Sequence, residues 1–185
     1  SRRRMPMEPI LPIFVLLGAL GLLLASGIAS AWVGRRSEEI AALLGVSGAV
    51  AACLAGLGAA LAALVSRADA ALSFPWSMPY GAFSVGIDPL SAFFLIPTFL
   101  LSGLAAVYAI GYFQPWNGRN PGRFWLFYNA LIASMALVVM ARNGVLFLVA
   151  WEAMSLASFF LVIHDDAAEG VRDAGWTYLV ATHIG

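Results

Sequence analysis

The chain has 185 residues, of which 62% are hydrophobic and only 11% are charged, whereas a soluble domain is about 45–50% apolar and about 25% charged. Its net charge is zero and its basic residues, all arginine, form no stripe, which argues against nucleic-acid binding. The single cysteine, Cys53, excludes a disulfide and a cysteine-ligated metal site within these residues. The apolar residues form long unbroken runs, so the solvent that suits this chain is lipid.

Apolar stretches long enough to cross a bilayer recur along the chain. Five have the length of about 17–25 residues that a transmembrane helix needs, and a sixth begins before the sequence stops. They lie at about residues 10–32, 40–65, 90–113, 124–140, 145–163 and 171–185. We therefore expect an all-α integral membrane protein, a multi-span bundle of about five complete helices plus the start of a sixth. Residues 1–185 would form the N-terminal part of a single polytopic domain that continues beyond Gly185.

Small residues recur every three or four positions in the second stretch, a pattern that lets helices approach closely in lipid. They are Gly45, Gly48, Ala52, Gly56 and Ala60. We expect this face to be packing surface.

The loop between the second and third stretches has its own pattern. An aromatic segment with Phe74 and Trp76 precedes an alternating stretch at residues 82–87, which is typical of an interfacial segment followed by a short strand or hairpin. Asp88 then precedes Pro89, a favoured combination of helix cap and first helical residue. We expect the third helix to begin there, with Asp88 as a cap rather than a ligand.

Loop arginines suggest an orientation in the cell (inner) membrane. Arg35 and Arg36 follow the first stretch, and Arg119 and Arg123 follow the third. Positive-inside counting puts these loops in the cytoplasm and the N-terminus outside. The arginines at residues 2–4 favour the opposite orientation, so the expectation of an N-terminus outside rests on the loop arginines alone.

One charged residue, Glu152, lies well inside an apolar stretch, about seven residues or ~10 Å from its start. Loss of hydration disfavours an ionised carboxylate and a nearby cation favours it, so such a group can take up and release a proton when a neighbouring charge moves. Ser155 and Ala157 flank it with small side chains, which suggests that it faces other helices. Asn129 and Ser134 could bond to it. The alternative is a structural glutamate, kept protonated and bonded to a neighbouring helix.

His183 is the second candidate for proton translocation. Counting from Val171 places it about 18 Å into the sixth stretch. An imidazole near the membrane midplane can relay protons, although a neutral histidine that donates one hydrogen bond to a carbonyl fits equally well. We predict no catalytic residue, no metal ligand and no cofactor-binding residue in this chain.

The fifth stretch and its surroundings carry a motif. Residues 146–162 read Leu-Phe-Leu-Val-Ala-Trp-Glu-Ala-Met-Ser-Leu-Ala-Ser-Phe-Phe-Leu-Val, residues 174–179 read Ala-Gly-Trp-Thr-Tyr-Leu, and residues 182–185 read Thr-His-Ile-Gly. This motif resembles that of the antiporter-like membrane subunits shared by respiratory complex I, Mrp-type cation/proton antiporters and membrane-bound hydrogenases. It looks most like the hydrogenase-4 and formate hydrogenlyase branch, and the Asp-Pro-Leu-Ser-Ala-Phe-Phe of residues 88–94 is similar to the family's entry into its third helix.

The resemblance implies that Glu152 is the family's glutamate in the fifth helix, which modulates a lysine on a later helix and so controls proton uptake. The chain contains no lysine, and that helix would lie beyond Gly185. The resemblance also implies an N-terminus outside, in agreement with the loop arginines.

The leading hypothesis is a proton-translocating membrane subunit of a redox-driven complex, of hydrogenase-4/formate hydrogenlyase or NADH:quinone oxidoreductase type, with no bond chemistry and no cofactor of its own. Its partners would be the lipid bilayer and other membrane and redox subunits. One alternative is a subunit of a stand-alone Mrp-type cation/proton antiporter, which requires sodium-dependent proton flux without a redox partner. The other is an inert membrane anchor subunit, which would tolerate Glu152→Gln.

Overall fold

The computed structural model describes residues 10–75, 82–112, 120–165 and 170–184. Its elements are α1 (Leu11–Val33), α2 (Glu38–Ser66), β1 (Ala70–Pro75), β2 (Ala82–Ile87), α3 (Pro89–Tyr112), α4 (Pro121–Met140), α5 (Gly144–Val162), the 3-10 turn η1 (Ile163–Asp165) and α6 (Val171–Ile184). The helices α1 to α5 are long and apolar enough to cross a membrane. The predicted all-α, multi-span membrane fold with a short hairpin before the third helix is confirmed.

The helices α2, α4 and α5 begin where side chains cap them. Ser37, Asn120 and Asn143 each accept a hydrogen bond from the backbone N–H three residues further on, which satisfies a group that the helix itself leaves unbonded. The start of α2 at Glu38 and that of α4 at Pro121 therefore precede the apolar stretches of the sequence by two and three residues. Hydrophobicity marks the lipid-facing span, whereas the cap marks where the backbone becomes helical.

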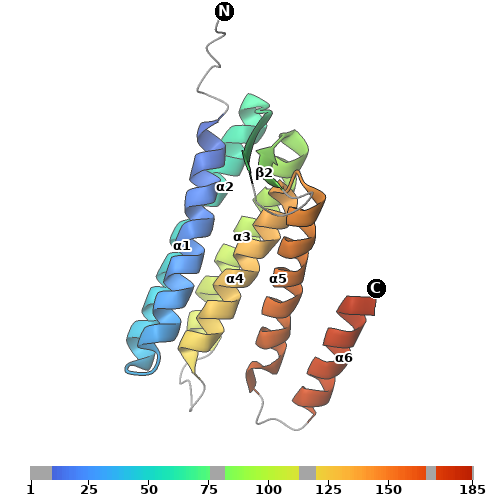
Figure 1. Ribbon diagram of the computed structural model, residues 1–185. Coiled ribbons are helices and arrows are strands. Elements are labelled where there is room, and N and C mark those ends of the chain that lie inside the picture. Colours follow the sequence, from blue (N-terminus) through green and yellow to red (C-terminus); the bar gives the residue numbers. More distant parts are fainter. Residues whose placement is uncertain (1–9, 76–81, 113–119, 166–169, 185) are drawn as a thin grey trace, which may run out of the picture.

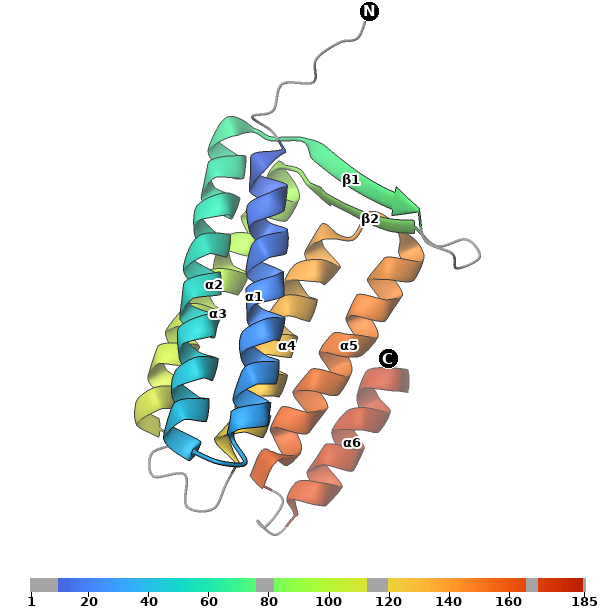
Figure 2. The same ribbon diagram turned by 60° about the vertical axis from the view of Figure 1, so that its left-hand side comes forward.

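The helices run up and down in a bundle (Figure 1). The helix α1 packs against α2 and α4, and α2 packs against α3. The helix α5 lies against α4, and α6 lies against α5 at the edge of the bundle (Figures 1 and 2). The hairpin of β1 and β2 lies across the end where α1 begins and α2 ends, which we call the hairpin end (Figure 2). The opposite end carries the turn between α1 and α2.

The small residues of α2 are packing surface, as predicted. Gly45, Gly48, Ala52, Gly56 and Ala60 are all buried. A Cβ atom added to Gly45 would overlap Cγ of Trp125 on α4, and one added to Gly56 would come within 2.6 Å of the Phe99 ring on α3. The bare backbone of α2 is therefore what lets two large aromatic rings fill the centre of the bundle.

Asn129 joins three helices by hydrogen bonds inside the bundle. This residue of α4 is completely buried, and its Nδ2 donates to Oγ of Ser26 on α1 at 3.0 Å and to the carbonyl of Gly45 on α2 at 3.3 Å. In lipid no water replaces such bonds, so the Asn129 Nδ2 group depends on these two acceptors within the protein, whereas its Oδ1 has no hydrogen-bond partner among the described residues.

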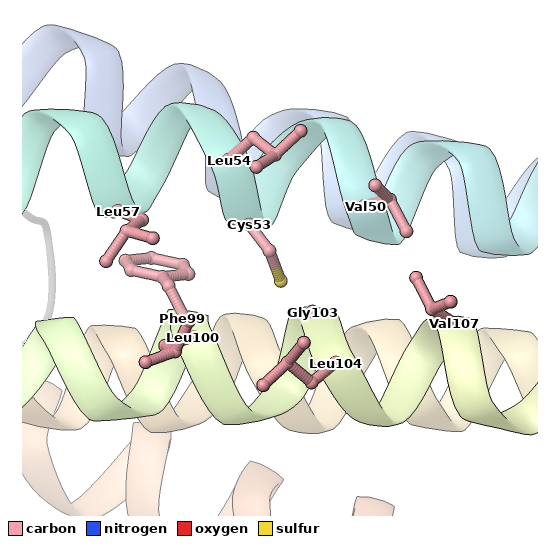
Figure 3. Close-up of a pocket in the computed structure, with 9 residues that line it drawn as sticks. All are labelled: Val50, Cys53, Leu54, Leu57, Phe99, Leu100, Gly103, Leu104 and Val107. Carbon is pink, nitrogen blue, oxygen red and sulfur yellow. The ribbon is translucent and has the colours of Figure 1, made fainter.

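An apolar cavity of about 140 Å³ remains between α2 and α3. Cys53 points toward it and Gly103 faces Cys53 from α3 (Figure 3). Cys53 is 3% exposed, and a Cβ at Gly103 would lie 3.2 Å from the Cys53 Cβ. The thiol is thus a packing group of this helix pair.

Asp88 caps α3 and also forms an ion pair. Its Oδ1 accepts from the N–H of Ser91 at 2.7 Å, which confirms the predicted cap, and its Oδ2 lies 2.7 Å from Nη2 of Arg142. These contacts favour the ionised form, so the pKa of Asp88 lies below its ordinary value of 3.8, first because of the Ser91 N–H and then because of Arg142. The ion pair joins residues 54 positions apart, and nothing in the sequence pattern indicates it.

The close approach at Gly45 yields a stability prediction. We expect Gly45→Ala to lower the free energy of unfolding by about 1–3 kcal/mol, because the new methyl group displaces Trp125 in a packed core. Gly58→Ala on the same helix is the matched control, since a Cβ there meets nothing within 4 Å and alanine favours the helix. The measurement is denaturant unfolding in detergent micelles, and equal effects of the two substitutions would contradict this packing.

The capped and paired Asp88 yields a pH prediction. Because its folded-state pKa is depressed below 3.8, its stabilisation is complete above that pH and is lost as the pH falls through the lowered pKa. We expect the thermal unfolding midpoint of the detergent-solubilised protein to drop as the pH falls below about 4, and to drop less in Asp88→Asn, which has no titrating carboxyl. Identical pH profiles for the two proteins would show that Asp88 contributes nothing to the acid sensitivity.

Candidate functional site

Glu152 lies near the middle of α5, eight residues after Gly144 and ten before Val162. At 1.5 Å per residue it is about 12 Å and about 15 Å from the two ends. Among the described residues, the other carboxylates of the five span-length helices are Glu38 and Glu39 in the first turn of α2. Glu152 is therefore the one described carboxylate in the interior of such a helix.

His183 of α6 is the hydrogen-bonding partner of Glu152. The His183 Nε2 lies 2.9 Å from Glu152 Oε1, and the two side chains are 40% and 50% exposed. The structure thus brings together the two residues that the sequence analysis selected independently. A carboxylate and an imidazole in direct contact form a pair that can hold a proton at either atom.

The other ring nitrogen of His183 fixes the tautomer. Its Nδ1 lies 2.8 Å from the carbonyl oxygen of Leu179, and because a carbonyl can only accept, Nδ1 must carry a hydrogen. Nε2 is then the nitrogen that gains or loses a proton, and it is this atom that faces Glu152. The site can therefore be a neutral carboxyl beside a neutral imidazole, or a carboxylate beside an imidazolium.

The contact between Glu152 and His183 could have been predicted by counting how many residues separate each of them from the near end of its helix. From Glu152 the chain descends ten residues to the end of α5, and from Val171 it rises twelve residues to His183. These are about 15 Å and about 18 Å of helix. Two antiparallel neighbours with such counts bring both side chains to nearly the same depth.

Polar side chains continue along the seam between α5 and α6. Ser158 donates to the carbonyl of Ser155 at 2.9 Å and is hydrogen-bonded across the seam to the Tyr178 hydroxyl. Together with Thr182 these residues border a cavity of about 340 Å³ between α4, α5 and α6. The cavity is large enough for water, its lining is mostly apolar, and its polar groups are the hydroxyls of these residues and of Ser155. Nothing in the sequence pattern marks Ser158 and Tyr178 as site residues, because hydroxyls on helices are common.

The surroundings of Glu152 differ in part from the expectation. Its side chain faces the neighbouring helix α6 through His183 and is half exposed. Asn129 does not reach it, since its amide bonds to α1 and α2, and Ser134 donates to the Ala130 carbonyl of its own helix. The Asn129 amide thus bonds to helices on the far side of α4, and the Ser134 hydroxyl is bonded within α4.

Metal binding has no structural support within the described residues, where no three His, Cys, Asp or Glu side chains gather closely enough to hold an ion. That the chain carries no cofactor stays a prediction.

No protein-family model matches the chain, but several curated proteins are similar. Hydrogenase-4 component B of Escherichia coli (strain K12) is 33% identical over 99 residues, which are 54% of this chain and 15% of that protein. NADH-quinone oxidoreductase subunit L of Mycobacterium tuberculosis (strain ATCC 25618 / H37Rv) is 36% identical over 137 residues, 70% of this chain and 21% of that protein. The Escherichia coli (strain K12) subunit L is 29% identical over 160 residues, 82% of this chain and 25% of that protein.

The chain spans a quarter or less of the length of each of these relatives. Its span-length helices identify it as a multi-pass membrane protein. The chain is homologous to membrane subunits of the antiporter-like family of complex I and hydrogenase complexes, which confirms the family that its motif indicates.

Proposed function

We propose that this chain is part of a proton-translocating membrane subunit of a redox-driven complex, of hydrogenase-4 or NADH:quinone oxidoreductase type. In this proposal Glu152 and His183 form one proton-binding site. The observation that carries it is the 2.9 Å contact between Glu152 in the interior of α5 and His183 in the last turn of α6. The named relatives support the class of complex, and therefore other membrane and redox subunits as partners.

The site works by moving a single shared proton. With Nδ1 engaged by Leu179, the proton between Nε2 and Oε1 is the one that can be exchanged. A cation that approaches Glu152 favours the carboxylate and drives the proton toward His183, and its departure reverses the transfer. The family resemblance implies a lysine on a later helix as this cation.

Protons reach the pair along the polar seam between α5 and α6. Ser158 and Tyr178 lie on the side of Glu152 that leads to the end of α5 opposite the hairpin, and the cavity beside them is large enough for water. That end also carries Arg35 and Arg36 in the turn after α1. By the positive-inside rule it would be the cytoplasmic end of the chain in the cell (inner) membrane, with the start of α1 outside.

Proton pumping tests the role of Glu152. In inverted vesicles that contain the full parent complex, we expect Glu152→Gln to lower the number of protons pumped per electron by about tenfold or more, because the amide keeps the shape but cannot carry the proton. Electron transfer is measured separately. Glu39→Gln, an exposed carboxylate in the first turn of α2, is the matched control and should pump normally.

The same assay separates the alternative functions. Unchanged pumping in Glu152→Gln would make Glu152 structural and remove the central group of the proposal. Sodium-dependent proton flux without a redox partner would identify a cation/proton antiporter. A complex that pumps normally when both Glu152 and His183 are replaced would indicate that this chain is an anchor.

Coupling between the two residues gives a second test. If they hold one proton as a unit, His183→Gln should reduce pumping on its own but should cost little further in a Glu152→Gln background, because the unit is already broken. The measurement is the pumping ratio of both single variants and the double variant in the same vesicles. Effects that multiply would mean that His183 acts elsewhere.

A further inference from the structure

The side chain of Arg142 connects the start of α3 with the turn between α4 and α5. Its Nη2 lies 2.7 Å from Oδ2 of Asp88 and 3.2 Å from Oγ of Ser91. Asp88 caps α3 through its other carboxylate oxygen at the same time. The ion pair therefore joins the beginning of α3 to the residue that stands two positions before α5.

The backbone of the same turn is attached to the hairpin. The N–H of Arg142 donates to the carbonyl of Ser84 in β2 at 2.8 Å, beside the bridge between Val85 and Ala141. A Cβ atom on Gly86 would lie 2.7 Å from Nε of Arg142, so β2 passes directly against the guanidinium. The start of α5 is thus fixed by one ion pair and by strand-like backbone bonds.

The fully buried face of α5 carries mostly small side chains. Its buried residues are Leu146, Ala150, Ser155 and Ala157. Three of these four are small, so Leu146 is the one large, fully buried side chain of α5 that resists sliding. The ring of Phe160 stacks on Phe127 with 4.4 Å between centroids, and stacked flat rings resist sliding less than interlocked ones. A slide of one residue is about 1.5 Å, enough to break a hydrogen bond of 2.9 Å.

We propose that Arg142 and Asp88 are positioning residues for the proton-binding site, because their ion pair sets where α5 begins along the bundle and thereby holds Glu152 opposite His183. The inference rests on the proposed function for its effect on pumping. Its effect on the surroundings of Glu152 can be measured separately.

Carbodiimide labelling of Glu152 in the full parent complex tests the inference. Dicyclohexylcarbodiimide modifies protonated carboxyls in apolar surroundings, and mass spectrometry gives the labelling rate at each pH, with Glu152→Gln as the blank. Asp88→Asn keeps an oxygen that caps α3 but removes the ion pair. We expect its labelling midpoint to move to higher pH by about half a unit or more, because the ionised Glu152 loses its contact with His183.

Two further variants separate positioning from loss of fold. Gly86→Ala keeps both charges but crowds the Arg142 guanidinium, and it should shift the labelling midpoint in the same direction. If Asp88→Asn does not accumulate in the membrane, the test is made with Gly86→Ala. Arg142→Lys retains a cation and should restore part of the wild-type profile. Asp69→Asn is the matched control, because Asp69 is exposed near the same end of the bundle and forms no ion pair with a described residue.

The outcomes are distinguishable. Wild-type labelling profiles in both Asp88→Asn and Gly86→Ala would overturn the positioning role, as would an equal shift in Asp69→Asn. Shifted profiles together with normal pumping in Glu152→Gln would uphold the positioning role while removing the proposed function of the site.

Discussion

Hydrocarbon offers no hydrogen bonds, so a polar group inside a membrane must find its partner within the protein. The helices of this chain meet that requirement along their backbones, and their exposed first N–H groups are met by the side chains of Ser37, Asn120 and Asn143. Inside the bundle Asn129 bonds to two other helices. The lack of a competing solvent therefore favours the position of Asn129 between α1 and α2, where its Nδ2 has two acceptors.

The same constraint defines the candidate site. Glu152 and His183 would each be costly in lipid, and their mutual contact removes part of that cost. A purely structural pair needs only this contact. A proton-sharing pair also needs one nitrogen free to exchange, and the Leu179 carbonyl provides this by holding the hydrogen on Nδ1. The Leu179 carbonyl, which bonds to Nδ1 of His183, is thus what suits the contact between Glu152 and His183 to proton exchange.

Packing is distributed unevenly over the bundle. The helices α1 to α4 are locked together where glycines of α2 receive Trp125 and Phe99, whereas α5 and α6 are joined mainly by small and hydroxyl-bearing side chains. A tightly packed core costs energy to deform, and a seam with few interlocking side chains moves more readily. The site lies at α5 and α6, while the ion pair of Arg142 and Asp88 ties the start of α5 to the start of α3.

The sequence by itself determined the membrane environment, the helices, the hairpin and the cap at Asp88, because hydrophobic length and cap chemistry are local properties. It also singled out Glu152 and His183, since an ionisable residue stands out within an apolar run. Only the tertiary structure decided that these two residues touch, that Asn129 belongs to the α1–α2 side, and that Arg142 pairs with Asp88. These contacts join residues on different elements, and the angle at which each helix presents a side chain is set by packing rather than by the order of residues.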